Sequence, residues 1–220
     1  MSGAAPIQAS PDLPAATFAD LIWPVAQGRS PSVLRGVVLS VMGACLLTMA
    51  AKITVPGPIN ITLQSLAVLV LGAVLGSRLA LASVALYLAE GALGLPVFTN
   101  TPPLPAGLAY LLGPTGGFLV GFAASAAIVG VAADRGLIGR PVVFALALIA
   151  GNAALMAIGC LWLAFFAHLG SGMTGIGLAK AWSVGVAPFL LSETIKVALA
   201  AVALPVVWDA ASRLLRRPIG

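Results

Sequence analysis

The sequence predicts an all-α integral membrane protein with six transmembrane helices. Of its 220 residues, 60% are hydrophobic and only 8% are charged, and the mean hydropathy is +1.11. A soluble domain carries about a quarter charged residues, so this chain has too few polar groups to cover a surface that faces water. The net charge of +5 is typical of the Arg and Lys surplus in cytoplasmic loops. It therefore predicts a lipid bilayer, and no nucleic acid, as the partner.

Apolar runs between charges and Gly or Pro breaks define the expected spans. A spanning helix needs about 20 apolar residues, and the six runs are about 34–53, 61–76, 79–94, 115–133, 142–168 and 184–208. The second and third runs are short, so neighbouring loops are expected to fill the remaining membrane depth. Backbone that is not helical at that depth has to line a cavity enclosed by protein. The pattern therefore predicts a pocket.

The chain outside these runs is expected to form two tails. Residues 34–210 are expected to be a single membrane domain, preceded by a cytoplasmic tail at 1–33 and followed by a basic cytoplasmic tail at 211–220. The first tail has neither a basic start nor a long apolar stretch, so no cleavable signal peptide is expected. It is expected to be partly disordered or interfacial, because the patch 18–26 with Trp23 suits a membrane surface.

The arginines predict the orientation of the spans. All eight lie on one side of a six-span arrangement, and the opposite loops contain only Lys52 and Lys180. Cytoplasmic loops are enriched in Arg and Lys, so both termini are expected in the cytoplasm. A five-span arrangement would divide the arginines between the two sides, which favours six spans.

Two of the outer loops are unusual for segments exposed to water. Residues 54–60 and 95–114 are rich in Pro and Gly and nearly uncharged. Such rigid, apolar loops suit a role in closing over a buried ligand. The alternative is that they are tight connections at the lipid surface.

Glu193 and Lys196 are the main candidates for a binding site. They lie three residues apart in the last apolar run, so on a helix they share one face. An isolated charge within a membrane costs several kcal/mol, and such residues usually face a bundle interior or a cavity. The pair therefore predicts a polar ligand site, and the alternative is an ion pair that only fixes helix packing.

The segment 113–122, "GPTGGFLVGF", is expected to begin a helix, because Pro114 suits the first turn and Thr115 suits a cap. The free N–H groups of Thr115, Gly116 and Gly117 would then form an anion site on the outer side. The glycines could also serve close helix packing, and the two roles are compatible.

A stripe of small residues in the first span has a spacing of four. Such a stripe allows another helix to approach closely, either within the chain or from another subunit. Its members are Gly36, Ser40, Ala44 and Thr48.

The sequence offers no catalytic constellation and no metal site. It contains no Walker A, HExxH or GxSxG motif, and His168 is its only histidine. Cys45 and Cys160 each lie in an apolar run without a partner, which indicates buried packing residues. Glu90, alone at the end of the third span, suits an interface or a cavity better than catalysis. No enzymatic activity, metal or cofactor is therefore expected.

Five segments resemble, in order, the motifs of one known family. They are "VPGPINITLQ" (55–64), "LPVFTN" (95–100), "GPTGGFLVGF" (113–122), "GNAAL…GCLWLA" (151–164) and "APFLLSETIKVALA" (187–200). The family is BioY, the biotin-binding S component of energy-coupling factor (ECF) transporters, and the resemblance covers residues 34–205. It implies a six-helix protein of the bacterial cytoplasmic membrane that captures biotin from outside with high affinity. It also implies a coupling protein (EcfT or BioN) and ATPase subunits (EcfA or BioM) as partners.

The resemblance assigns roles to individual residues. Lys196 occupies the position of the family's lysine, and Glu193 stands where the family usually has Asp. Asn100 matches a polar position that contacts biotin, and Gln64 belongs to a segment resembling the loop that closes the site. The small stripe resembles the surface by which S components dock on the coupling protein.

Biotin suits these residues chemically. Glu193 can accept from its ureido N–H groups, while Lys196 or Asn100 can donate to its carbonyl oxygen. The valerate carboxylate would bind the N–H groups at 115–117, and the apolar walls would be Tyr110, Phe118 and Trp162. The reverse orientation, with Lys196 on the carboxylate, stays open. Two other functions also stay open, namely an S component for another vitamin and a membrane scaffold that does not transport.

Overall fold

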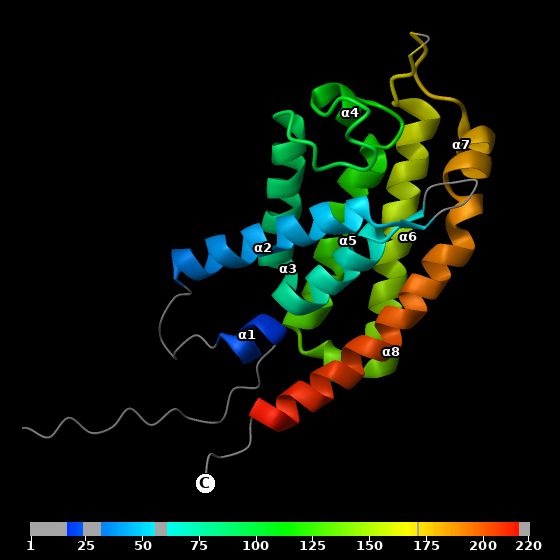
Figure 1. The fold of residues 1–220 in the computed structure, drawn as a ribbon. Coiled ribbons are helices and arrows are strands. Elements are labelled where there is room, and N and C mark those ends of the chain that lie inside the picture. The colour runs from blue at the N-terminus through cyan, green and yellow to red at the C-terminus, as the bar shows by residue number, and fades with distance from the viewer. Residues whose placement is uncertain (1–16, 24–31, 56–60, 171, 216–220) are drawn as a thin grey trace, which may run out of the picture.

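The computed structural model describes residues 17–23, 32–55, 61–170 and 172–215. These residues form a helical bundle in which α5 lies between α3 and α6 (Figure 1). Two strands of two residues each pair antiparallel at the outer end of α2. The elements are α1 Phe18–Ile22, α2 Val33–Lys52, β1 Thr54–Val55, β2 Ile61–Thr62, α3 Gln64–Ala92, α4 Leu108–Leu112, α5 Gly116–Asp134, η1 Leu137–Gly139, α6 Pro141–Phe165, α7 Leu178–Gly185, η2 Ala187–Phe189 and α8 Leu190–Leu215.

Long apolar helices account for most of the expected spans. α2, α5 and α6 agree with the expected spans 34–53, 115–133 and 142–168 to within three residues at each end. Within the described residues, five helical segments are long and apolar enough to cross a membrane. The fold is therefore that of an all-α, multi-pass membrane protein, as expected.

The two short spans expected at 61–76 and 79–94 form the two arms of α3. Gly76 separates the arms with φ 74° and ψ 174°, a conformation that residues with a Cβ rarely adopt. A Cβ at this position would also overlap the carboxylate of Asp134. The Ser77 N–H donates to Asp134 Oδ2 at 3.0 Å, which fixes the start of the second arm. Whether each arm crosses the membrane, giving six spans, stays a prediction.

The boundaries expected for the last span, 184–208, are wrong. Residues 178–185 form the separate helix α7, and the turn η2, which contains Pro188, precedes α8. Proline lacks an N–H group and restricts the residue before it, so the chain bends there and α8 begins only at Leu190. α8 then continues through Asp209 to Leu215, so its last residues, 211–215, form the start of the expected tail, whose location in the cytoplasm stays a prediction.

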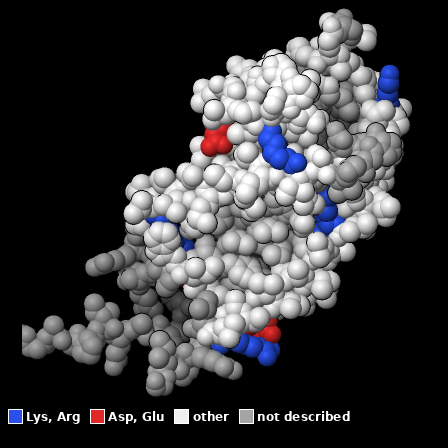
Figure 2. All heavy atoms as spheres, in the orientation of Figure 1, with Lys and Arg blue, Asp and Glu red and all other residues white. Residues whose placement is uncertain are grey.

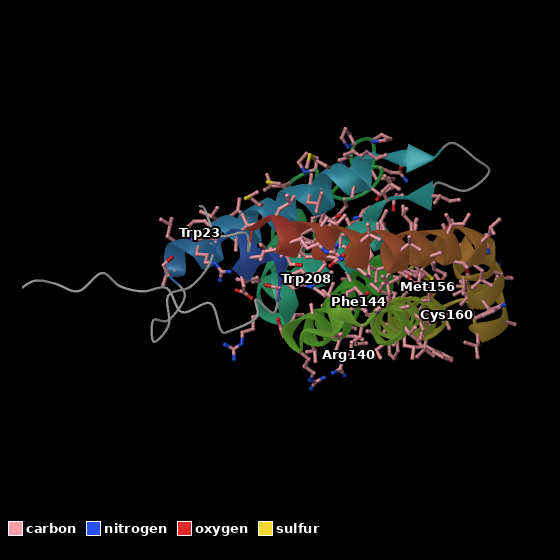
Figure 3. All side chains as sticks on the ribbon, turned by 90° about the horizontal axis from the view of Figure 1, so that it is seen from below. Trp23, Arg140, Phe144, Met156, Cys160 and Trp208 are labelled. Atoms are coloured by element: carbon pink, nitrogen blue, oxygen red, sulfur yellow. The ribbon has the colours of Figure 1, made fainter. Side chains whose placement is uncertain are left out.

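The segment around Phe18 packs into the bundle. Phe18 and Ala19 are buried, and the Phe18 ring meets the edge of Trp208 with 5.0 Å between centroids. Figure 3 shows Trp208 beside α1. Asp20 accepts a 2.9 Å ion-paired hydrogen bond from the buried Arg35 of α2. This part of the predicted tail is therefore a docked helix, whereas residues 24–26 of the predicted interfacial patch lie outside the described residues.

Three segments next to arginines come together at one end of the bundle: α1, whose Asp20 pairs with Arg35, η1, which lies between Arg135 and Arg140, and the end of α8, which contains Arg213. α1, η1 and the end of α8 lie at this end, while α4 and α7 lie at the other (Figure 1). Apolar side chains are exposed along α2, α6 and α8, and most of the face shown in Figure 2 is uncharged. These surfaces suit lipid contact. The location of both termini in the cytoplasm stays a prediction.

The small stripe of α2 does not form one outward surface. Ala44 is fully buried in the core with Ala80 and Val84 of α3, while Gly36, Ser40 and Thr48 are half-buried. The expectation that Ala44 serves partner docking is therefore wrong for this structure, because its small side chain lets α3 approach from within the chain.

Candidate functional site

A cavity of about 500 Å³ lies at the end of the bundle that carries α4 and α7. Most of its wall is apolar, and its polar groups come from α3, α8 and the outer loops. A mostly apolar pocket with a few convergent polar groups is typical of a small-molecule site. The wall includes Thr62, Gln64, Ser65, Thr99, Asn100, Tyr110, Thr115, Phe118, Leu119, Phe122, Met156, Leu163, Val184, Phe189, Glu193 and Lys196.

Glu193 and Lys196 form an ion pair in this wall. Lys196 Nζ donates to Glu193 Oε1 at 2.7 Å, and both side chains are more than nine-tenths buried. Ser65 of α3 completes a triangle, since its hydroxyl donates to Glu193 Oε1 at 2.8 Å and accepts from Lys196 Nζ at 2.9 Å. The two ionised groups are therefore held both to each other and to the first arm of α3.

The triangle leaves hydrogen-bonding capacity on both charged groups. Glu193 Oε2 is buried and has no hydrogen-bond partner within the described residues. Lys196 uses two donors, whereas an ammonium group has three. A buried acceptor without a partner costs about 1–3 kcal/mol, so the site favours a ligand that donates to Glu193. No cluster of three or more potential metal ligands occurs among the described residues.

Gln64 holds the loop 95–114 to α3. Its Nε2 donates to the buried Tyr87 hydroxyl at 2.7 Å, and its Oε1 accepts from Thr99 Oγ1 at 2.8 Å. Tyr110 donates to the Thr99 carbonyl at 2.8 Å. Burial raises the pKa of Tyr110, which keeps its phenol protonated as a donor. Gln64 and Tyr110 both line the cavity, but their hydrogen bonds serve mainly to shape its outer wall.

Asn100 lies at the exposed rim of the cavity. It has a positive φ of 58°, a conformation in which Asn is enriched. Its carbonyl accepts from the Leu104 N–H at 2.9 Å. The turn therefore aims an amide-bearing residue from the outer loop at the site that also contains Glu193.

The N-terminus of α5 differs from the anion site expected there. Thr115 lines the cavity, but the Gly116 N–H donates to the Gly113 carbonyl at 3.2 Å. Gly116 and Gly117 lie outside the cavity lining, and a Cβ at Gly117 would overlap Trp162. Gly117 thus allows α5 to pack against α6, and Gly116 allows close approach of the Leu111 carbonyl of α4. The expected set of three free N–H groups is wrong for Gly116.

Trp162 was expected in the cavity wall, but it lies outside the cavity lining. Its Nε1 donates to the Gly113 carbonyl at 3.0 Å, and its ring packs against Gly117. It therefore supports the start of α5 instead of lining the cavity. Phe118, which the sequence also indicated, does line it.

Seven residues that the sequence indicated for the site line the same cavity: Gln64, Asn100, Tyr110, Thr115, Phe118, Glu193 and Lys196. The sequence analysis missed Ser65, Tyr87 and Thr99, which connect these residues to one another. Ser65 directly follows Gln64 in a motif already noted, which was the only available signal. Residues 56–60, half of the segment 55–64 expected to close the site, lie outside the described residues.

A second hollow lies between α6, α7 and α8. It has a volume of about 800 Å³, an almost wholly apolar lining, and two residues in common with the cavity, Met156 and Glu193. Figure 3 shows Met156 and Cys160 on α6. The buried Asn152 Oδ1 in this lining has no hydrogen-bond partner within the described part of the chain.

A comparison with known families identifies the chain. The family model described as the BioY family matches residues 22–213, which include the whole cavity. The chain belongs to the BioY family. The resemblance drawn from the sequence motifs is therefore confirmed.

Named BioY proteins are similar over most of their length. A probable biotin transporter BioY from Pyrococcus horikoshii is 35% identical over 167 residues, which cover 76% of this chain and 91% of the relative. The biotin transporter BioY of Thermotoga maritima is 35% identical over 172 residues, or 76% of this chain and 92% of the relative. The biotin transporter BioY2 of Lactococcus lactis is 34% identical over 170 residues, or 76% and 86%.

A solved structure supports the fold of this BioY chain. The crystal structure of the S-component for biotin from an ECF-type ABC transporter superposes with a TM-score of 0.67. The sequences are 21% identical, and the match covers 82% of this chain and 95% of the other. The BioY chain therefore has an S-component fold, as expected from the motifs.

Proposed function

We propose that this BioY chain captures biotin from the outer side of the membrane and delivers it as the substrate-binding subunit of an ECF transporter. It is a transporter subunit, not an enzyme. One observation carries the proposal: a buried pair, Glu193 and Lys196, lines a mostly apolar cavity and retains a carboxylate oxygen without a partner. The names of the BioY relatives and of the structural match support biotin as the ligand.

The ureido ring of biotin suits the inner part of the cavity. Its two N–H groups are donors and its carbonyl oxygen is an acceptor. Glu193 Oε2 is an acceptor without a partner, and the third donor of Lys196 can reach a carbonyl oxygen. Charge-assisted hydrogen bonds of this kind are about twice as strong as neutral ones, so the pair would supply both affinity and orientation.

The remainder of biotin suits the other walls. Phe118, Leu119 and Met156 offer apolar surface to the thiophane ring and the alkyl chain. The valerate carboxylate would then lie toward the rim, near Thr115 and Asn100. In the reverse orientation the carboxylate would face Lys196, but Glu193 would then present an unpaired oxygen to an anion. We therefore favour the orientation with the ureido ring inward.

The partners follow from the S-component class. We propose a transmembrane coupling protein (EcfT or BioN) and ATPase subunits (EcfA or BioM) in the cytoplasmic membrane, because this chain has no Walker A motif of its own. The coupling protein would dock on the half-buried Gly36, Ser40 and Thr48 of α2. Ala44 is excluded from that surface by its burial.

Calorimetric titration of the purified chain in detergent tests the ligand. We expect one biotin per chain, bound tightly, and no heat with riboflavin or thiamine. Heat with another vitamin and none with biotin would overturn the ligand while leaving the S-component fold intact. Binding of no vitamin would favour a scaffold without transport.

A further inference from the structure

Lys52, at the end of α2, donates hydrogen bonds to two backbone carbonyls of the loop 95–114. Its Nζ donates to the Phe98 carbonyl at 2.7 Å and to the Thr101 carbonyl, and it lies 3.4 Å from Thr101 Oγ1. Phe98 and Thr101 are themselves almost fully buried. The Phe98 carbonyl also accepts from the Thr101 N–H at 3.3 Å and from Thr101 Oγ1 at 2.6 Å. Lys52, itself an exposed residue, therefore adds a charged donor at one end of the turn and supplies a donor to the Thr101 carbonyl at the other.

The two carbonyls held by Lys52 lie on either side of Asn100. Between them, the Thr99 carbonyl accepts from Tyr110, and the Asn100 carbonyl accepts from the Leu104 N–H. All four consecutive carbonyls from residue 98 to residue 101 therefore have donors. This set of bonds fixes the turn in which Asn100 has its positive φ.

Aromatic packing holds the Phe98 end of the turn but makes no contact with the Asn100 side chain. Phe98 stacks on Tyr110 with 4.8 Å between centroids, and its ring meets Tyr87 edge-on at 5.4 Å. Thr99 is held by Gln64 and Tyr110, whereas the two bonds from Lys52 connect both ends of the turn to α2. Lys52 is thus the group that ties the cavity rim to α2.

We propose that Lys52 is a positioning residue for the ligand: it holds the turn 98–101 so that Asn100 faces the cavity. The proposal rests on the proposed function, since Asn100 is taken to contact biotin. Lys52 acts through the turn and lies outside the cavity lining. Its loss should therefore speed ligand release without changing the walls formed by α5, α6 and α8.

Binding of tritiated biotin by the variant Lys52→Met tests this role. We expect affinity about tenfold weaker, equivalent to about 1.4 kcal/mol, with most of the change in the dissociation rate. Lys52→Arg should stay within about threefold of the parent, because it keeps charged donors. Lys180→Met is the matched control, since Lys180 is an exposed lysine of α7 outside the cavity lining. Should Lys52→Met not fold, Lys52→Gln replaces it.

A double-mutant cycle separates positioning from general stability. Asn100→Gly keeps the left-handed conformation and removes the amide. In that background Lys52→Met should weaken biotin binding less than twofold, because the two residues act together. An equal tenfold effect in both backgrounds, or a lower melting temperature with unchanged biotin release, would overturn the proposal.

A spin label on the loop tests the same proposal without biotin. In a background without Cys45 and Cys160, a nitroxide at position 104 reports the loop, and one at position 93 serves as control. Lys52→Met should increase the mobility of the spin label at position 104 but not at position 93. Unchanged mobility at position 104 would refute the proposal that Lys52 holds the turn. If the parent chain binds no biotin, the proposed function fails, but the spin-label result still decides whether Lys52 holds the turn.

Discussion

Removing both members of the buried ion pair separates a ligand-binding role from a structural one. The double variant Glu193→Gln with Lys196→Met eliminates the charges but keeps similar side-chain volumes. Loss of one partner leaves a buried charge alone and costs about 3–5 kcal/mol, whereas replacing a whole pair is often neutral. Both side chains are more than nine-tenths buried, so this asymmetry should appear clearly in thermal unfolding without ligand.

The effect on biotin binding follows from the contacts that the pair can still make. Glu193 Oε2 has no protein partner within the described residues, and Lys196 has one donor beyond its bonds to Glu193 and Ser65. Each charged hydrogen bond to a ligand contributes about 1.5–3 kcal/mol, or roughly 10- to 150-fold in affinity. With one such bond from each residue, we expect the double variant to bind biotin at least a hundredfold more weakly.

Retention of tritiated biotin and the melting temperature, measured on the same preparation, provide the test. The matched control is Glu90→Gln with Lys180→Met, which makes the same chemical changes outside the cavity lining. We expect the control to bind like the parent. A double variant that is stable and also binds biotin like the parent would refute the ligand role and leave a structural ion pair.

Three further predictions concern positions around the site and at the opposite end of the bundle. Ser65→Ala should weaken biotin binding at least about tenfold, measured by the same retention assay, because it removes two hydrogen bonds to the charged pair, a kind of bond that contributes about 1.5–3 kcal/mol. Gly76→Ala should lower the free energy of unfolding by about 1–3 kcal/mol, while Gly139→Ala, with no atom near its Cβ position, should not; equal melting temperatures would contradict the strain. Asp20→Asn should destabilise the chain by about 1–3 kcal/mol because its arginine partner is buried, whereas Asp209→Asn, in an exposed pair, should change stability by less than about 1 kcal/mol.

Composition and apolar run lengths were sufficient to predict the fold class and most helices. The ends of α2 and α5 were found to within one residue, because charges and glycines mark them. The end of α8 was missed because an amphipathic last turn with Asp209 and Arg213 continues the helix beyond the apolar run. Hydropathy measures how apolar the side chains are, so it does not detect helical turns that continue beyond the apolar run.

The stripe on α2 shows a second limit of sequence patterns. A small residue permits close approach from either side of a helix, and spacing by four identifies the face without saying what covers it. In the structure α3 covers Ala44. The docked α1 was missed for the same reason: Phe18 lies in a stretch too short to register as a span, yet it fits against Trp208 of a helix nearly two hundred residues later.

Some residues of the candidate site can be found from local sequence spacing, whereas others become apparent only from the tertiary structure. Glu193 and Lys196 were found because a spacing of three positions brings two side chains onto the same face of a helix, and because charged residues are rare in an apolar run. Ser65, 128 residues away from Glu193, carries no such signal. Lys52 was noticed only as a rare outer cation, since its acceptors are backbone carbonyls and every residue has one of those. A sequence can therefore reveal the charged group that meets a ligand, but the groups that hold the wall in place become visible only once the loop has been folded against the helix.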